Sequence, residues 1–274
     1  MSEPGPVGVV IPAYNEGAVI QRLLDGLAPG LADGSLEVVV VPNGCTDDTA
    51  EVARAAGFPV IELDQGDKIA ALNAGDAALS SYPRFYVDAD VVLDAGGLLR
   101  LADAFDASTL AVSPAVGHDM TGTSFLARSY LRIWYRLEWA ADSLTGRGCY
   151  GVSRAGRERW DQFSDAGDDA FINSLFTRDE RRVVPAVTSV VRGPRTLWSA
   201  IQIKRRIHKG NREVEERGVA VTSSTGWIDV VRREPRRLLD APVYVIATVV
   251  ARLLAAGDRR RGATEWHRDS TSRT

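Results

Sequence analysis

Short apolar runs alternate with helical patterns through the first hundred residues of this 274-residue chain. Each run is bounded by turn-forming residues, and the links between runs are short. Strands and helices that alternate in this way are typical of a parallel sheet with right-handed crossovers. The sequence therefore predicts an α/β fold, with strands over Val7 to Pro12, Leu36 to Val41 and Pro59 to Leu63, a fourth strand starting at Phe85, and helices that end near Leu27, Ala56 and Leu79. Asn15 is expected to cap the first of these helices.

Composition narrows the class of protein. Apolar residues make up 45% of the chain and charged residues 25%, which is ordinary for a soluble globular protein. A net charge of −3 argues against a general nucleic-acid binder. Two cysteines give no disulfide framework and indicate a reducing compartment. The N-terminus has no signal-peptide pattern, and no apolar run reaches the roughly 20 residues of a membrane span. We expect a cytoplasmic chain with one large domain, or a domain with an appendage.

The fourth strand runs directly into a pair of carboxylates. In Phe85-Tyr86-Val87-Asp88-Ala89-Asp90-Val91-Val92 the acids follow the strand at the carboxyl edge of the sheet, where open α/β folds bind ligands. Residues two apart in a strand point to the same side, and two like charges there repel each other unless a cation is bound. Mg²⁺ or Mn²⁺ suits such a pair, because these ions take one or two carboxylates and complete their shell with water and phosphates. The pair alone fits a metal site and a simple Asx-type turn equally well.

Three later segments carry further expectations. Phe125 to Trp139 has a helical pattern with aromatic residues on more than one face, which favours a core helix over an acceptor-binding wall. Gly146 to Gly151 is dense in glycine and can approach a ligand closely. Ala166 to Asp169 begins a helix that continues to about Phe176.

The last third of the chain is basic and then apolar. Nine Lys or Arg residues occur between Arg181 and Arg212 without an acid, which is typical of a solvated basic face and also suits contact with phosphates. Four arginines then precede Leu238 to Ala256, an apolar stretch interrupted by Asp240 and Arg252. This pattern fits an interfacial helix on anionic lipid and a helix packed against protein equally well.

Four motifs in order resemble the family-two glycosyltransferases of GT-A fold. They are Val10-Ile11-Pro12-Ala13-Tyr14-Asn15-Glu16, Asn43-Gly44-Cys45-Thr46-Asp47-Asp48-Thr49, Lys68-Ile69-Ala70-Ala71-Leu72-Asn73-Ala74-Gly75 and the Asp88/Asp90 pair. The match spans about residues 7 to 92 and resumes at Asp168 and Asp169. The resemblance implies a Rossmann-like, mostly parallel sheet flanked by helices, with a smaller C-terminal region on the acceptor side.

The resemblance also implies a role for each motif residue. A nucleotide-diphospho-sugar donor of UDP or GDP type is expected to bind Pro12, Ala13, Tyr14, Glu16, Asn43, Lys68, Asp88 and Arg205. Asp88 matches the residue near the ribose and the metal, and Asp90 matches the direct ligand of Mg²⁺ or Mn²⁺. Asp168 and Asp169 match an acidic pair whose second member is the general base, a group that accelerates transfer on the order of 10²- to 10⁴-fold. The alternative for this pair is charge complementarity at a helix N-terminus.

Several residues depart from the family pattern. Pro42-Asn43-Gly44-Cys45 stands where Asp-Asp-Gly-Ser is frequent, which leaves the nucleotide base open. Asp67 precedes Lys68 where glycine is usual. Gln202-x-x-Arg205 resembles the Gln-x-x-Arg-Trp motif of processive synthases, but Arg206 replaces the tryptophan, which favours transfer of one sugar per encounter. Arg205, Arg206, His208 and Lys209 are candidates to clamp the diphosphate from a mobile loop, and His208 is either a second metal ligand or a structural histidine.

From these observations we expect a donor-binding half over residues 1–116, an acceptor and catalytic half over 117–226, amphipathic helices over 227–257 and a disordered tail over 258–274. The expected reaction transfers a sugar with inversion to a lipid-linked, glycan or small-molecule acceptor. We expect a cytoplasmic enzyme, with peripheral contact to the inner face of the membrane and no nucleic-acid partner.

Two other functions fit part of the sequence. Asp88-Ala89-Asp90-Val91-Val92 also fits the loop of haloacid-dehalogenase-like phosphatases, in which the first Asp is a nucleophile. That loop normally follows the first strand, and Ile172 stands where the family's late acid would be. A non-catalytic sugar-nucleotide binder or membrane-associated scaffold is the other alternative, although an inactive chain has no need to keep mutually repelling carboxylates.

Overall fold

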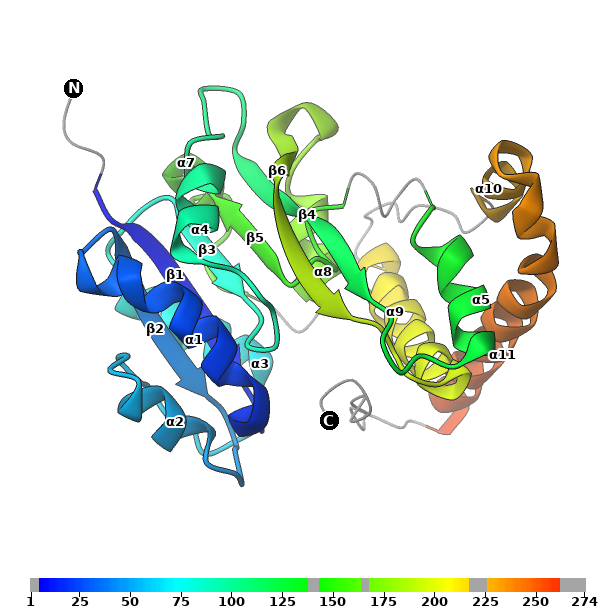
Figure 1. Ribbon diagram of the computed structural model, residues 1–274, viewed down its shortest axis with the longest axis horizontal. Coiled ribbons are helices and arrows are strands. Elements are labelled where there is room, and N and C mark those ends of the chain that lie inside the picture. Colours follow the sequence, from blue (N-terminus) through cyan, green and yellow to red (C-terminus); the bar gives the residue numbers. More distant parts are fainter. Residues whose placement is uncertain (1–4, 138–142, 164–167, 217–225, 262–274) are drawn as a thin grey trace. The chain divides into compact units, whose positions relative to one another are not determined.

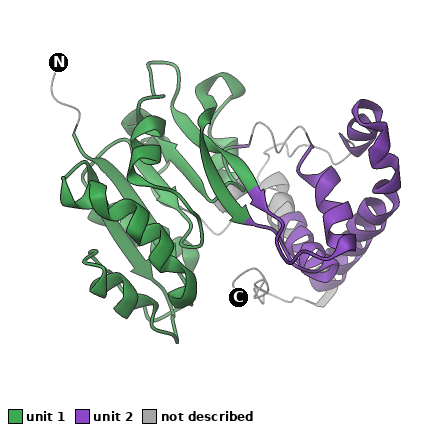
Figure 2. Cartoon of the chain, in the orientation of Figure 1, with its two compact units in different colours: residues 1–117, 144–191, 273 green, residues 118–143, 192–272, 274 purple. Residues whose placement is uncertain are grey.

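The computed structural model describes residues 5–137, 143–163, 168–216 and 226–261, and only the backbone of 168–170, 209–216 and 259–261 (Figure 1). Contacts within the chain divide it into two compact units (Figure 2). Unit 1 contains residues 1–117 and 144–191, and unit 2 contains residues 118–143 and 192–272. Unit 1 therefore takes in 144–191 in addition to the expected donor half.

Unit 1 holds a sheet in the strand order β2-β1-β3-β5-β4-β6. The sheet is parallel across β2, β1 and β3, and antiparallel from β3 through β5 to β4. These strands and the helices and turns around them are β1 Val7–Ala13, α1 Gly17–Ala32, β2 Leu36–Pro42, α2 Thr49–Ala55, α3 Lys68–Ala78, β3 Arg84–Val87, α4 Ala95–Ala102, β4 Ala111–Asp119, β5 Cys149–Val152, α7 Arg154–Arg157, α8 Asp168–Ser174, η1 Arg178–Glu180 and β6 Arg181–Arg192. The predicted α/β class with flanking helices is confirmed.

The central strands are apolar throughout because both faces of the sheet are covered. Every residue of β1 is buried. Val9 and Ile11 belong to the core shared with α1 and α4, whereas Val10 belongs to the core shared with α3. Alternate side chains of one strand thus enter different layers, as the strand period requires.

Two local expectations were wrong. The segment from Pro59 to Leu63 is not a full strand and adds only single parallel bridges to β2 and the residue after it, at Val60 and Leu63. Asn15 does not cap α1, because it adopts a positive φ of 52° and its Oδ1 accepts a hydrogen bond from the Thr46 N–H at 2.8 Å. The side chain is therefore used to join two loops instead of closing the first turn of the helix.

Unit 2 is helical and includes α5 Phe125–Trp134, α9 Leu197–Glu216, α10 Trp227–Arg233, η3 Pro235–Leu239 and α11 Ala241–Arg261. Its core brings together side chains of α5, α9, α10 and α11, including Tyr130, Ile201 and Tyr244. The rings of Tyr130 and Tyr244 stack with centroids 5.4 Å apart. This packing supports the core-helix interpretation of the aromatic segment from Phe125, of which residues 138–142 lie outside the described part.

The helix α11 ends later in the chain than the sequence pattern indicated. It continues to Arg261, so the tail expected from residue 258 is helical at its start, and residues 262–274 lie outside the described part. The window Ala241–Asp258 has a mean hydropathy of 1.4 and is one-third buried, which by length and composition alone is enough to cross a membrane. The expectation that no segment would meet this criterion was therefore wrong. A core helix of a soluble protein meets the same criterion.

Candidate functional site

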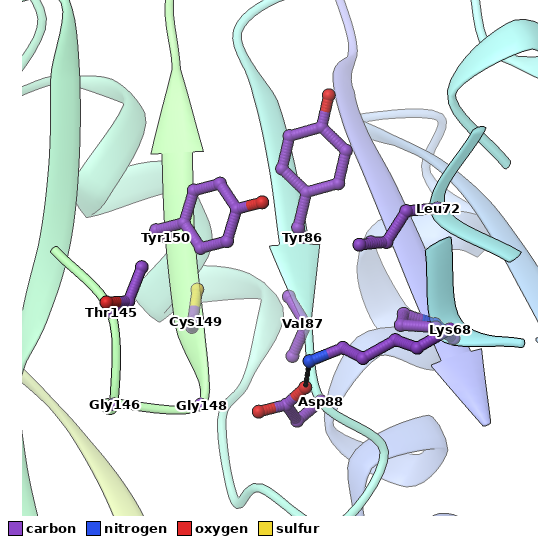
Figure 3. Close-up of a pocket in the computed structure, with 11 residues that line it drawn as sticks. Lys68, Leu72, Tyr86, Val87, Asp88, Thr145, Gly146, Gly148, Cys149 and Tyr150 are labelled. Carbon is purple, nitrogen blue, oxygen red and sulfur yellow. Dashed lines mark hydrogen bonds and ion pairs between the residues drawn. The ribbon is translucent and has the colours of Figure 1, made fainter. Parts of the chain in front are cut away.

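The carboxyl ends of β1 and β3 meet at one edge of the sheet in unit 1. The register pairs Val10 with Tyr86, which brings Asp88, two residues later, to the level of Pro12. A pocket lies at this edge (Figure 3). Its lining comes from β1, from the first turns of α3, from the end of β3 and the residue after it, and from β5 and the segment that leads into it. These residues are Pro12, Lys68, Leu72, Tyr86, Val87, Asp88, Thr145, Gly146, Gly148, Cys149 and Tyr150.

Lys68 and Asp88 form an ion pair across this pocket. The Nζ of Lys68, in the first turn of α3, lies 3.1 Å from Oδ1 of Asp88, immediately after β3 (Figure 3). The two side chains are 26% and 45% exposed. An ammonium and a carboxylate are therefore held at the pocket within reach of solvent, which suits binding of a charged ligand.

Asp88 and Asp90 lie in a turn, not in the strand. β3 ends at Val87, and the Val91 N–H donates to the Asp88 carbonyl at 3.2 Å, closing a turn over the four residues 88–91. The prediction that strand alternation points both carboxylates to one side was wrong, because the alternation of side chains stops where the turn begins. The predicted position of both acids at the carboxyl edge of the sheet was correct.

The two acids fit a hard divalent cation only if a ligand completes its shell. Within the described ranges no three His, Cys, Asp or Glu side chains gather as a ready-made metal site. Mg²⁺ binds proteins in just this way, through one or two carboxylates with water and substrate phosphates in the other positions. The donor set of Asp88 and Asp90 is therefore suited to a metal that arrives with a phosphorylated substrate.

Gly148 supports the turn that carries these acids. Its carbonyl accepts a hydrogen bond from the Asp88 N–H at 2.8 Å, and its φ is +68°. A Cβ at this position would lie 2.2 Å from Cγ2 of Val91, inside the turn. Only glycine satisfies both conditions. The close approach expected of the glycine-dense segment is thus made to the acidic turn and to the pocket beside it.

A buried ionic network fixes α3 against β3. The Asp76 carboxylate accepts from Arg84 Nη1 at 2.7 Å, from Tyr86 Oη at 2.5 Å and from Arg157 Nε at 2.8 Å. Burial alone would raise the pKa of Asp76, but hydrogen bonds from Arg157, Tyr86 and Arg84 outweigh it and lower the pKa below its ordinary value. Lys68 lies at the start of the same helix, so the network holds Lys68 opposite Asp88.

The residues proposed to hold the nucleoside are largely buried and are joined by hydrogen bonds. Pro12, Ala13, Glu16 and Asn43 are buried and Tyr14 is half-buried. The Asn43 Nδ2 donates to the Ala13 carbonyl at 2.8 Å, so this amide joins the ends of β2 and β1. The Glu16 N–H donates to Thr49 Oγ1 at 2.8 Å. The structure brings these five residues together, although Asn43 uses its amide within the protein.

The unusual Asp67 has a local explanation. Its carboxylate accepts hydrogen bonds from the Ile69 N–H at 2.8 Å and the Ala70 N–H at 3.1 Å, which caps α3. A capping acid satisfies backbone donors that would otherwise lack partners at the helix start. The departure from glycine therefore stabilises the helix that presents Lys68.

The proposed general base lies at the start of α8. The helix begins at Asp168, as predicted, but the side chains of Asp168 and Asp169 and residues 164–167 lie outside the described part. The chain just before them is anchored, because Asn73 Nδ2 donates to the Phe163 carbonyl at 3.2 Å and the Phe163 N–H donates to Asn73 Oδ1 at 2.8 Å. The Asn of the Lys68–Gly75 motif thus ties α3 to the segment that leads to α8.

The basic candidates of the C-terminal part lie in unit 2. Arg205, Arg206, His208 and the backbone of Lys209 belong to α9, so the expected mobile loop is a helix. Arg205 Nε lies 2.5 Å from Asp258 Oδ2, and its Nη1 donates to Gln202 Oε1 at 2.9 Å. These contacts give Arg205 a packing role between α9 and α11, and its part in binding donor remains a prediction.

His208 has surroundings that disfavour a metal. Burial, together with the positive charges of Lys204 and Arg252, lowers the pKa of His208 to about 4, so the ring is neutral at pH 7. A divalent cation beside it would meet the same two charges. The structural interpretation of this histidine is the better supported of the two.

Comparison with known proteins identifies the family. The family model for glycosyl transferase family 2 matches residues 8–163, which is more than half of the chain. The chain belongs to glycosyl transferase family 2. The matched region contains all four motifs, the Lys68–Asp88 pair and Gly148. The phosphatase alternative is therefore dropped.

Individual relatives of this family-2 chain are similar over shorter stretches. Glucosyl-3-phosphoglycerate synthase of Mycobacterium tuberculosis is 42% identical over 60 residues, which cover 22% of this chain and 18% of that protein. An uncharacterized glycosyltransferase of Mycobacterium bovis is 33% identical over 100 residues, covering 36% and 44%. The matches thus span less than half the length of these curated relatives.

Solved structures share the fold. The Mycobacterium tuberculosis glucosyl-3-phosphoglycerate synthase in complex with Mn²⁺, UDP and glucosyl-3-phosphoglycerate has a TM-score of 0.58 at 22% identity, over 80% of this chain and 82% of that one. The same enzyme with Mn²⁺, UDP-glucose and phosphoglyceric acid has a TM-score of 0.59 at 20% identity. The predicted GT-A fold is confirmed.

Sequence reasoning missed the support of the site. It named Lys68 and Asp88 but not the network of Asp76, Arg84 and Arg157, which lies in three separate elements. One signal was available, since an arginine that opens an apolar strand, as Arg84 does, needs a buried carboxylate partner. The choice of Asp76 as that partner depends on the packing of α3 on β3.

Proposed function

We propose that this chain is a metal-dependent glycosyltransferase that moves one sugar from a nucleotide-diphospho-sugar of UDP or GDP type to an acceptor hydroxyl. The observation that carries the proposal is the Lys68–Asp88 pair, which lies at a pocket beside the turn containing Asp90. Membership of glycosyl transferase family 2 supports the reaction class. The Mn²⁺ and UDP-glucose bound by the structurally similar synthase support the class of donor.

The charge of each side chain would decide its role in binding the donor. Lys68 would place a positive charge beside the diphosphate, and Asp88 and Asp90 would hold Mg²⁺ or Mn²⁺ together with phosphate oxygens. Such an ion, when bound, neutralises charge on the departing nucleotide diphosphate. The loop with Tyr14 and Asn43 would hold the nucleoside, and Arg205 would contribute to donor binding.

On the acceptor side, Asp169 would take the proton from the attacking hydroxyl, with Asp168 as the alternative base. Attack on the side opposite the leaving group would invert the anomeric carbon. The acceptor is proposed to be lipid-linked, a glycan or a small molecule, and phosphoglyceric acid belongs in the screen because the similar synthase binds it. We propose a cytoplasmic location that includes the inner face of the membrane.

A thermal-shift screen of nucleotides and nucleotide sugars with and without Mn²⁺ tests the donor and the metal. A ligand that binds only the native state raises its stability in proportion to the logarithm of its concentration above Kd. We expect a UDP- or GDP-sugar to raise the Tm only when Mn²⁺ is present. Asp90→Ala should abolish this shift and metal-dependent transfer while leaving the Tm of the ligand-free protein within ~2 °C. Undiminished turnover in this variant would contradict the metal assignment.

The non-catalytic alternative predicts a different outcome. A sugar-nucleotide binder would show the Mn²⁺-dependent shift but would release no nucleotide, whatever acceptor is added. An enzyme releases UDP or GDP faster with its acceptor than with water alone. Measuring nucleotide release with metal, across lipid-linked, glycan and phosphoglyceric acid acceptors, separates the two.

A further inference from the structure

The helix α11 is apolar on more sides than its packing in unit 2 explains. Tyr244, Ala247 and Ala251 face the core that α11 shares with α5 and α9. A second set of apolar side chains points outward at helical spacing. This set, called here the outer face of α11, consists of Val245, Ile246, Val249 and Leu253, and Ile246 and Leu253 are 63% and 67% exposed. A helix that is apolar around its whole circumference requires an apolar environment beyond its own core.

Neighbouring residues enlarge this surface at both ends. Leu238 and Leu239, in the η3 turn just before α11, are also exposed. At the other end a groove in unit 2 continues from Leu253 and is lined by Arg205, Val250, Leu253, Leu254, Gly257 and Asp258. Contiguous exposed apolar surface of this kind marks a site of interaction with a protein or a membrane.

The charge around the outer face identifies the partner. Residues 226–261 contain eight arginines and four acids, whereas the whole chain has a net charge of −3. Between Ala241 and Gly257 the only charged residue is Arg252. Arg232 and Arg236 pair with Asp229 at 3.2 Å and Glu234 at 3.3 Å, but both arginine side chains are three-quarters exposed. Exposed pairs of this type are weak, so phosphate groups can compete for the arginines.

We propose that the outer face of α11 docks on an anionic phospholipid surface, with the helix lying in the plane of the interface. Apolar side chains would enter the acyl boundary, and the arginines that precede the helix would meet lipid phosphates. A second copy of this chain is a poorer partner, because pairing two such surfaces would bring arginines together. A transbilayer orientation would separate the buried side of α11 from α5 and α9.

Vesicle co-sedimentation with the full chain tests the proposal. We expect binding to vesicles of phosphatidylcholine mixed with phosphatidylglycerol, weak binding to phosphatidylcholine alone, and release by high salt. The double substitution Ile246→Glu with Leu253→Glu should reduce partitioning at least ~10-fold, because each residue contributes the burial of a large apolar side chain. Arg232→Glu with Arg236→Glu should reduce it about fivefold or more per arginine on anionic vesicles only.

Leu126→Glu, an exposed leucine of α5 in the same unit, is the matched control and should bind like the unsubstituted chain. Equal loss in this control would overturn the assignment to α11. So would three other results: equal binding to neutral vesicles, retention in the bilayer after an alkaline wash, and a lipid-independent dimer that the Ile246/Leu253 substitutions dissociate. The proposal does not rest on sugar transfer, because the Mn²⁺-dependent nucleotide shift is measured without vesicles and should be unchanged in these variants.

Discussion

The Lys68 ammonium lies 3.1 Å from Oδ1 of Asp88, although the two residues are 20 positions apart and belong to different elements. The N-cap at Asp67 fixes the start of the helix that carries the lysine, and the carbonyl of Gly148 fixes the backbone of the aspartate. The pair is partly exposed to solvent, so it adds little to the stability of the fold. Its position at the pocket indicates a role in binding charge.

Replacing Lys68 with alanine should therefore separate binding from folding. We expect the free energy of unfolding of Lys68→Ala to change by less than ~1 kcal/mol, since exposed ion pairs contribute no more than this. The affinity for the nucleotide-diphospho-sugar should fall about 10- to 100-fold, the value of a charge-assisted hydrogen bond. Urea unfolding and calorimetric titration measure the two quantities. Lys68→Arg, which keeps the charge, should retain most of the affinity, and loss of stability without loss of affinity would contradict the assignment.

The Asp76 network should show the opposite behaviour. In Asp76→Asn the guanidinium groups of Arg84 and Arg157 lose their buried counter-charge, and we expect the free energy of unfolding to fall by about 3–5 kcal/mol. Glu62→Gln, which breaks an exposed pair with Arg54, is the control and should change it by less than ~1 kcal/mol. Urea unfolding at neutral pH measures both.

The pH dependence of the same variant follows from the lowered pKa of Asp76. At a pH between the pKa of Asp76 in the folded chain and its ordinary pKa, the unfolded chain binds more protons than the folded chain. The stability of the fold therefore rises with pH in this range. The contribution is complete above about pH 4 and is lost as the pH falls further. The difference between Asp76→Asn and the unsubstituted chain should shrink below about pH 4, and a constant difference would contradict the charge-based account.

The part of the fold with strong periodicity could be predicted from sequence. The buried strands and α3 were predicted from their apolar runs. The position of the two acids was predicted because ligands bind at the carboxyl edge of a parallel sheet, where β3 ends. The antiparallel pairing of β5 between β3 and β4 could not, because β5 is only four residues long and its partners lie far away in sequence. The turn at Asp88 and Asp90 could not be predicted for the same reason. The Gly148 carbonyl that holds the start of this turn comes from the distant segment that leads into β5.

Gly148→Ala tests whether this glycine holds the acidic turn. The added methyl would strain a positive φ and would also meet Val91 at 2.2 Å, so we expect a loss of at least ~2 kcal/mol in stability together with loss of metal-dependent donor binding. Gly57→Ala is the matched control, because its φ is +82°, nothing lies within 4 Å of its Cβ and it does not line the pocket. This control variant should lose only about 1–2 kcal/mol of stability and should keep its metal-dependent donor binding. Thermal melts and the Mn²⁺-dependent shift compare the two, and equal effects would remove the special role of Gly148.

Asp169→Asn tests the general base. An isosteric amide cannot accept the proton, so the rate should fall at least ~10²-fold while the affinity for the donor stays unchanged. Asp168→Asn in parallel shows which member of the pair acts, and a loss confined to Asp168→Asn would reverse the assignment. Single-turnover rates at saturating donor, with thermal melts for folding, measure the effect.

His208 should make unit 2 sensitive to acid. Its pKa is lowered from 6.5 to about 4 by burial and by the charges of Lys204 and Arg252. Between about pH 4 and 6.5 the unfolded chain therefore binds more protons than the folded one, and stability falls as the pH is lowered through this window. His208→Gln removes the titration, so its stability relative to the unsubstituted chain should rise as the pH is lowered from about 7 to about 5 in urea unfolding.

The charge of Arg252 can be tested separately. Because Arg252 is exposed, Arg252→Gln should fold normally and raise the pKa of His208 in an NMR titration. A pKa near 6.5 in the unsubstituted chain would show that the ring is solvated and would return His208 to the candidates for metal binding.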